Sequence, residues 1–283
     1  MSVHPGFTAI DAHQHFWEYD PVEYGWIDGS MSLLKRDFLP GDLAPLLAAE
    51  GMSGCIAVQA RQTEAETDFL LQLARENSFI KGVVGWLDLC AEHIGERLDA
   101  YQPFGLLKGV RHIVQAEPDP DFLLREEFIR GVHAVGAAGL AYDILVFERQ
   151  LPAVPRFLER CPDQVMVLDH IAKPVMEGGP SANWKAHIRA VAEHPNAYCK
   201  VSGMVTEADW RHWSAEDFFP YLEVVAEAFG PERLMVGSDW PVCLLAAPDY
   251  KTVLHIVRRF AGDWSVPEQE ALFGGTAARC YKL

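Results

Sequence analysis

Residues 165–170 read VMVLDH, an apolar run of strand length that ends in two ionisable side chains, Asp169 and His170. Short runs that are apolar on both faces are typical of strands in a parallel sheet that helices cover. Seven further runs of this kind are FTAID (7–11), CIAVQA (55–60), IKGVVGWL (80–87), LLKGVRHI (106–113), LAYDILVF (140–147), AYCKVSG (197–203) and LMVGSD (234–239). The sequence therefore predicts eight strands.

Amphipathic stretches of helical length separate these strands. Examples are ETDFLLQLARE (66–76), FIRGVHAVGAA (128–138), LPAVPRFLERC (151–161), KAHIRAVAEH (185–194) and FPYLEVVAEAF (219–229). Most strands begin about 25 to 37 residues after the previous one, which suits a strand, a crossover helix and two loops. Eight such units predict an α/β fold, a (β/α)₈ TIM barrel, with a doubly wound open sheet as the alternative.

The domain organisation follows from the absence of any Gly/Ser/Pro-rich linker, so we expect residues 1–283 to form a single domain. One connection is too long for a simple turn. Residues 16–45, rich in aromatic residues and proline, follow the first predicted strand. A long insertion at this point of a barrel lies on the catalytic face, where it is a candidate lid.

Composition excludes several classes of protein. Hydrophobic residues make up 49% of the 283 positions, too many for a mainly disordered chain. The formal net charge of -16 and the lack of a basic stripe argue against a nucleic-acid partner. No apolar stretch approaches the roughly 20 residues that span a bilayer, and the first residues lack the pattern of a signal peptide. Six scattered cysteines without a C-x-x-C pair predict reduced thiols and a cytoplasmic protein.

Candidate metal ligands occur where strands end, which is where barrel enzymes carry their catalytic residues. His13 and His15 are two residues apart, so their side chains point to the same side of a strand. His170 ends the sixth predicted strand and Asp239 the eighth. A lone histidine at a strand end is more often structural, but these four residues recur in order at the same edge. Such a mixed set suits Zn²⁺ or a similar divalent ion that activates water.

Other polar and aromatic residues gather at the same strand ends. Arg111 and His112 end the fourth strand, and Lys108 and Lys200 lie within strands, as substrate contacts or as partners of buried carboxylates. The candidates for substrate contact are Trp26, Gln59, Trp86, Tyr142, Asp143, Lys173 and Trp240. For each of these the alternative is a packing role in the core.

Five segments together resemble the amidohydrolase superfamily, and within it the sugar-lactone hydrolases, closest to the L-fuconolactonases. They are IDAHQHFW (10–17), GVRHIVQ (109–115), LDHIAKP (168–174), KVSGMVTEADW (200–210) and GSDWPVC (237–243). The resemblance runs from Ile10 to the closing GGTAARCY (274–281). It implies a (β/α)₈ barrel whose metal ligands match His13, His15, His170 and Asp239. The fifth predicted strand lacks the histidine of two-metal relatives, so we expect at most one divalent ion, with Zn²⁺ favoured. Some relatives with similar residues work without a tightly held metal, so whether the reaction requires the ion is open.

The resemblance also implies a reaction, the hydrolysis of a sugar lactone such as L-fucono-1,5-lactone in L-fucose catabolism. Asp239 would serve as the general base and return the proton to the leaving alcohol. Arg111 and His112 would polarise the carbonyl or hold the product. The substrate is expected to be a small-molecule lactone, with no nucleic-acid or membrane partner, and the oligomeric state is open.

Several other functions compete with this one. No G-x-S-x-G motif supports a serine hydrolase, and no glycine-rich turn supports a nicotinamide enzyme. Hydrolysis of a dicarboxylate lactone, of the muconolactone or pyrone dicarboxylate type, stays open. Its cations would be Arg61, Arg111, Lys173 and Lys200. A metal-dependent decarboxylase of the same superfamily and a non-catalytic barrel are further alternatives.

Overall fold

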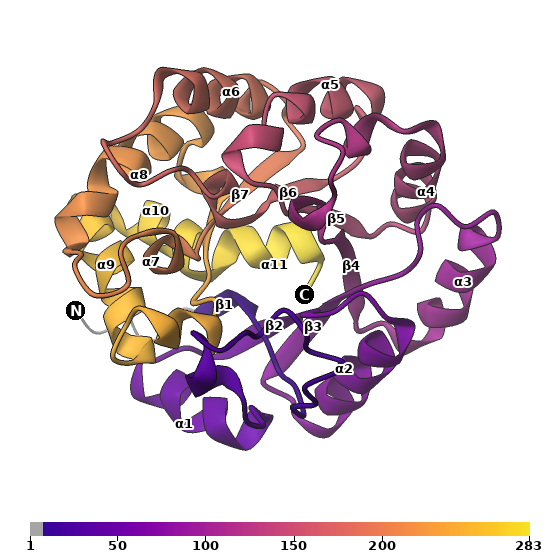
Figure 1. Cartoon of the computed structure of the whole chain (residues 1–283), viewed down its shortest axis with the longest axis horizontal. Helices are drawn as coiled ribbons and strands as arrows, with labels where there is room; N and C mark the ends of the chain where they lie inside the picture. Colours follow the sequence, from indigo (N-terminus) through magenta and orange to yellow (C-terminus); the bar gives the residue numbers. More distant parts are fainter. Residues whose placement is uncertain (1–7) are drawn as a thin grey trace.

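The computed structural model describes residues 8–283, which fold into a closed barrel of parallel strands surrounded by helices (Figure 1). The strands pair in chain order. They are β1 (Ile10–Gln14), β2 (Gly54–Val58), β3 (Ile80–Gly85), β4 (Leu107–His112), β5 (Ala141–Ile144), β6 (Met166–Leu168), β7 (Ala197–Val201) and β8 (Leu234–Val236). The backbone N–H of His15 donates to the carbonyl of Trp240 (2.7 Å), and that of Asp239 to the carbonyl of His13 (2.8 Å). These bonds close the barrel between β1 and the segment that follows β8.

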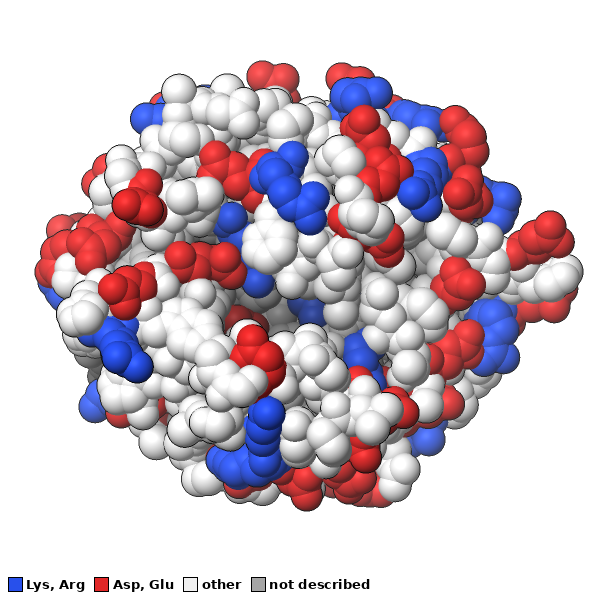
Figure 2. All heavy atoms as spheres, viewed as in Figure 1, with Lys and Arg blue, Asp and Glu red and all other residues white. Residues whose placement is uncertain are grey.

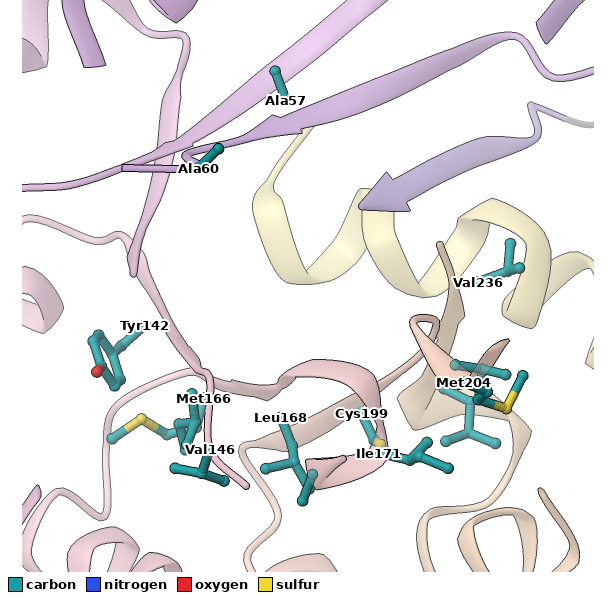
Figure 3. Close-up of a cluster of buried hydrophobic side chains, with 14 of the residues drawn as sticks. Ala57, Ala60, Tyr142, Val146, Met166, Leu168, Ile171, Cys199, Met204 and Val236 are labelled. Carbon is teal, nitrogen blue, oxygen red and sulfur yellow. The ribbon is translucent and has the colours of Figure 1, made fainter. Parts of the chain in front are cut away.

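Most of the helices form an outer ring around the strands, while α11 (Thr276–Tyr281) lies across the centre of the barrel (Figure 1). The other helices are α1 (Pro40–Ala49), α2 (Glu64–Glu76), α3 (Ile94–Tyr101), α4 (Glu126–Ala137), α5 (Ala153–Arg160), α6 (Ala182–Ala192), α7 (Met204–Glu207), α8 (Ala215–Phe229), α9 (Tyr250–Phe260) and α10 (Val266–Glu270). Outward-facing strand residues and inward-facing helix residues form one large core. Figure 3 shows part of it, where Met166, Leu168, Cys199 and Val236 come from three neighbouring strands. The predicted TIM barrel is confirmed.

The ends of several elements differ from the prediction. The first strand covers residues 10–14 and not 7–11, and Phe7 lies outside the described residues. The predicted strand at 234–239 ends at Val236. Asp239 lies beyond it in a left-handed backbone conformation (φ 58°) that a strand does not accommodate. The insertion at 16–45 ends earlier, because residues 40–45 already belong to α1. Proline at the first position of that helix looked like loop composition, but it is favourable there.

Residues 16–39 are fixed to the barrel mouth. The backbones of Trp17 and Phe38 exchange two hydrogen bonds (3.0 and 2.9 Å), and Phe38 packs edge-on against Trp240. The buried Tyr24 hydroxyl donates to Glu66 of α2 (3.4 Å). That this segment acts as a lid stays a prediction.

A second, smaller core fills the inside of the barrel. It includes Ile10, Val58, Val84 and Met235 and is closed at one end by Tyr281 of α11. The helix α11 crosses behind the strands in Figure 1. Polar side chains continue the barrel interior from this apolar layer toward the C-terminal ends of the strands. These polar residues form the site described next.

Two further expectations concern cysteines and the membrane. All six cysteines are free thiols, and five of them are buried. Among the described residues, no helix is both long and apolar enough to cross a bilayer.

Candidate metal and active site

Three imidazoles face one carboxylate at the C-terminal mouth of the barrel. The Nε2 atoms of His13, His15 and His170 lie 3.9, 3.3 and 4.0 Å from Oδ1 of Asp239. All four residues are at most 4% exposed. Ligand atoms of His13, His170 and Asp239 lie within 4.8 Å of one another, which is a spacing that one ion can bridge. The structure thus brings together the four residues that the sequence singles out as metal ligands.

Unusual backbone places two of these residues. His170, Ile171, Ala172 and Lys173 all have positive φ, between 43° and 61°. This left-handed turn follows β6 directly and is rare for residues with a side chain. Asp239 has φ 58° after the short strand β8. Strained backbone of this kind concentrates at functional sites.

Two glycines give the histidines room. A Cβ on Gly203 would lie 2.4 Å from Nδ1 of His170, and one on Gly237 would lie 2.6 Å from Cβ of His13. Gly203 also has φ 64°, a conformation that glycine adopts at no steric cost. The two glycines belong to the motifs KVSG and GSDWP. The sequence therefore showed both glycines, but not the close approach of the histidines that requires them.

Hydrogen bonds hold the rings of His15 and His170, and at His15 the partner also sets the tautomer. Nδ1 of His15 lies 2.7 Å from the carbonyl oxygen of Val58, which can only accept. Nδ1 therefore carries the proton, and Nε2 keeps its lone pair toward Asp239. Nδ1 of His170 lies 2.8 Å from Oγ of Ser202 on the other side of its ring. Such partners behind a ligand orient it and set its basicity.

Burial sets the charges of the site. It lowers the pKa of His170 to about 4, although Asp239 and Asp169 oppose this. Burial likewise lowers the pKa of His13 well below its usual range. Burial alone would raise the pKa of Asp239, but the neighbouring histidines outweigh it and hold that pKa below its usual range. Near neutral pH His13 and His170 are therefore neutral and Asp239 is ionised.

A buried ion network lies beneath the histidines. Lys200 donates to Asp143 (2.5 Å) and pairs with Asp169 (3.1 Å). Arg111 donates to Asp169 (2.9 Å) and lies 3.2 Å from Nε2 of His13. The hydroxyl of Tyr281 donates to Asp143 (2.8 Å), which joins α11 to the network. Charges that are fully buried persist only when paired in this way.

This donor set fits a divalent ion. Neutral imidazole nitrogens and a carboxylate oxygen are the ligands that zinc takes in catalytic sites. Burial keeps the imidazoles of His13 and His170 neutral, as metal binding requires. One contact competes with an ion, because the Arg111 guanidinium also points at Nε2 of His13.

The two residues predicted to act on the carbonyl have different surroundings. Arg111 points into the barrel and is 3% exposed. His112, the next residue on β4, points the other way. Its ring stacks on Phe122 (4.9 Å between centroids), its Nε2 lies 2.7 Å from Glu117, and the Trp86 indole N–H donates to its Nδ1 (3.3 Å). The structure thus does not bring His112 to the metal-site residues.

The predicted substrate contacts also separate into groups. Tyr142 is fully buried between Phe128 and Phe157 in the outer core, and Asp143 is fully buried in the ion network. These positions leave both without a surface for substrate. Trp240 is 2% exposed, and the Gln59 side chain is buried and donates to the carbonyl of Arg111 (3.1 Å).

Three predicted contacts keep accessible surface. Trp26 is 39% exposed and packs edge-on against Trp17. Trp86 is partly buried. Lys173 lines a cavity of about 860 Å³ formed by the loops that follow β5, β6 and β7. Figure 2 shows that this face of the molecule is hollowed near its centre, with charged side chains of both signs around the hollow.

Sequence reasoning missed two residues of this region. Ser202 holds His170, and Glu207 forms an ion pair with Lys173 (2.9 Å). Both follow β7 within the segment KVSGMVTEADW, whose motif could have drawn attention to them. Their partners lie more than thirty positions away in the chain, so only the fold shows the contacts.

Comparisons with known proteins agree along the chain. A family model described as amidohydrolase matches residues 10–283. The chain is 45% identical to an L-fucono-1,5-lactonase of Burkholderia multivorans, over 98% of this chain and 97% of that protein. An L-fucono-1,5-lactonase of Burkholderia ambifaria is 36% identical, over 97% and 95%. A crystal structure of a zinc-bound amidohydrolase from Burkholderia multivorans matches with a TM-score of 0.94 at 45% identity, covering 98% of this chain and 99% of that one.

Proposed function

The chain belongs to the amidohydrolase family, and from this premise we propose that it hydrolyses a sugar lactone, L-fucono-1,5-lactone or a close relative, to the aldonic acid. The observation that carries the proposal is the convergence of three buried imidazoles on Asp239 at the barrel mouth. Two relatives of similar length bear the name of this lactonase. The family resemblance expected from the motifs is confirmed.

His13, His15, His170 and Asp239 are the residues that would hold one divalent ion, with zinc favoured by the donor set. When bound, the ion would acidify nearby water and polarise the lactone carbonyl. His15 and His170 are preset for this by Val58 and Ser202, which leave both Nε2 atoms facing Asp239.

Asp239 acts as the proton carrier of the reaction. Its carboxylate is ionised and accepts a proton as the water oxygen bonds to the carbonyl carbon. The bond between that carbon and the ring oxygen then breaks, and Asp239 returns the proton to the ring oxygen. One water is consumed for each acid formed. A carboxylate with so low a pKa is a weak base on its own, so this step depends on a water that is more acidic than bulk water.

Arg111 positions the metal site and does not contact the carbonyl in this assignment. Its guanidinium is buried, donates to Asp169 and the backbone of Gln59, and faces His13 from below. It therefore holds the ring of His13 between itself and Asp169. The oxyanion role first considered for Arg111 gives way to this positioning role.

A dicarboxylate lactone is the main alternative substrate, and the cations it needs are already engaged. Arg61 pairs with Glu23 and Glu66, and Arg111 pairs with Asp169. Lys173 pairs with Glu207, and Lys200 with both Asp143 and Asp169. Because each is neutralised by a carboxylate of this chain, a doubly charged substrate would find little compensation. This favours a neutral lactone.

The test is a pH-indicator assay of acid release from a panel of aldonolactones and two dicarboxylate lactones, with and without chelator. The proposal expects rapid hydrolysis of L-fucono- or L-galactonolactones. Chelation should abolish it, and added zinc should restore it. The variant Asp239→Asn should lose turnover while keeping the wild-type circular dichroism spectrum. No acid release from any sugar lactone, or a D239N variant with normal turnover, would contradict the proposal.

A further inference from the structure

The cavity of about 860 Å³ is formed by the loops after β5, β6 and β7, and its lining includes Lys173, three residues after His170. Its wall is chemically mixed. Phe147 follows β5, Lys173 follows β6 and Glu207 ends α7 after β7. An aromatic ring and a pair of opposite charges thus share one wall. Carbohydrate rings present both an apolar C–H face and a set of hydroxyl groups, so this wall matches their surface.

The Lys173–Glu207 ion pair has unused hydrogen-bonding capacity. Nζ of Lys173 lies 2.9 Å from Oε1 of Glu207 and 5.4 Å from the centre of the Phe147 ring. The two side chains are 15% and 19% exposed and both line the cavity, so a ligand in the cavity can reach them. An ammonium has three N–H groups and a carboxylate has two acceptor oxygens. The pair can therefore donate to one hydroxyl and accept from its neighbour while staying intact.

The backbone ties this pair to His170. The N–H of Lys173 donates to the carbonyl of His170 (2.8 Å) within the left-handed turn. Glu207 belongs to the short helix that begins directly after Gly203, against which the His170 ring packs. A ligand bound by the pair is therefore held at a fixed position relative to the metal-site residues. Such fixed placement of a substrate is a large part of catalysis.

From this geometry we infer that Lys173 and Glu207 bind adjacent hydroxyl groups of the sugar ring, with Phe147 against its C–H face. The pair selects polyhydroxylated lactones over unsubstituted ones. This inference rests on the proposed function and identifies the residues that recognise the sugar hydroxyls.

The charge of the wall supports a neutral ligand. Five acidic side chains line the cavity, against two basic ones, Arg149 and Lys173. The excess of negative charge repels an anionic lactone. A neutral sugar lactone pays no such cost, and its hydroxyls can donate to the carboxylates. The same wall favours departure of the product, because hydrolysis converts the neutral lactone to an anion.

The experiment compares two lactones with the same ring size. L-Fucono-1,5-lactone carries ring hydroxyls and δ-valerolactone carries none. The variants are Glu207→Gln and Lys173→Met, with Glu177→Gln as the control, since Glu177 lines the same cavity but makes no ion pair among the described residues. A charge-assisted hydrogen bond corresponds to about a tenfold or larger change in affinity. We expect kcat/KM for the fuconolactone to fall by about that factor in both variants, mainly through KM. The value for valerolactone should stay near that of the wild type.

A second measurement separates this inference from the proposed function. L-Fucose, whose pyranose ring carries the hydroxyls of the lactone and an anomeric hydroxyl in place of its carbonyl, is titrated into the metal-loaded protein by calorimetry. Weaker binding in both variants, with unchanged binding in E177Q, supports the subsite whether or not the wild type hydrolyses sugar lactones. Equal losses on both lactones would indicate a structural role and overturn the inference, as would unchanged kinetics in the two variants. If the wild type neither hydrolyses sugar lactones nor binds L-fucose, both proposals fail.

Discussion

Gly203 lies directly against the ring of His170, and a Cβ at this position would be 2.4 Å from Nδ1 and 2.7 Å from Cγ. The same ring is held by Oγ of Ser202, 2.8 Å from Nδ1. Ser202 and Gly203, which follow β7, thus fix the position of His170, which lies on the loop after β6. The position of His170 depends on both strands.

Gly203→Ala is therefore expected to damage the metal site. The added methyl group would displace the His170 ring from its position opposite Asp239, because it would clash with Nδ1 and Cγ. The left-handed backbone costs alanine about 1 to 2 kcal/mol in addition. We expect a lower unfolding temperature and a large loss of zinc affinity, measured by competition with a chromogenic chelator. Gly95→Ala in α3 is the matched control, since nothing lies within 4 Å of its Cβ. A G203A variant that binds zinc like the wild type would contradict this account of the glycine.

Ser202→Ala removes the hydrogen-bond partner of His170 and adds no steric clash. Removing such a partner typically lowers metal affinity by about 10- to 100-fold. The fold should persist, because the hydroxyl is small and its loss leaves only one ring nitrogen without a partner. The measurement is zinc affinity by chelator competition, with Ser53→Ala on the surface as the control. Equal affinities in S202A and S53A would show that Ser202 does not orient His170.

The barrel and its four metal-site residues were predictable because both follow from local patterns. Strand runs recur at crossover spacing, and parallel strands end at one edge, so His13, His15, His170 and Asp239 had to meet there. The site residues that the structure does not bring together were adjacent to others on the same strand. Arg111 and His112 cannot both point inward, and neither can Tyr142 and Asp143, because side chains alternate along a strand. A pair separated by one residue, as in His13 and His15, avoids this error.

The parts that could not be predicted depend on contacts between distant segments. Whether Lys200 met a substrate or a carboxylate was undecidable until Asp143 and Asp169 were placed beside it. Glu207 reaches Lys173 only because α7 turns back over the barrel mouth after Gly203. Such contacts leave no periodic trace in a single sequence.

Lys200→Met tests the buried ion network. It leaves Asp143 without its cationic partner inside the barrel, and breaking a buried pair in this way costs about 3 to 5 kcal/mol of unfolding free energy. The double variant Lys200→Met/Asp143→Asn removes the uncompensated charge as well, so we expect it to recover part of the loss. Urea denaturation measures both. Arg156→Met, which breaks an exposed pair with Asp121, controls for the loss of a cation. If K200M were as stable as R156M, the network would have no structural role.

His112 provides a final test, because it separates a role in catalysis from a role in packing. Burial lowers the pKa of His112 below its usual value of 6.5, in spite of the opposing effect of Glu117. As the pH falls below about 6.5, His112 becomes protonated in the unfolded chain but stays neutral in the folded protein. The unfolding free energy therefore decreases. In His112→Gln this contribution is absent, and stability should fall less steeply between pH 7 and pH 5. Denaturant titrations across this range measure the difference, with His133→Gln in α4 as the control.

Because His112 faces Phe122 and Glu117 and not Asp239, lactonase turnover at neutral pH should stay close to that of the wild type. A strong loss of kcat in H112Q, with the fold intact, would return His112 to the reaction.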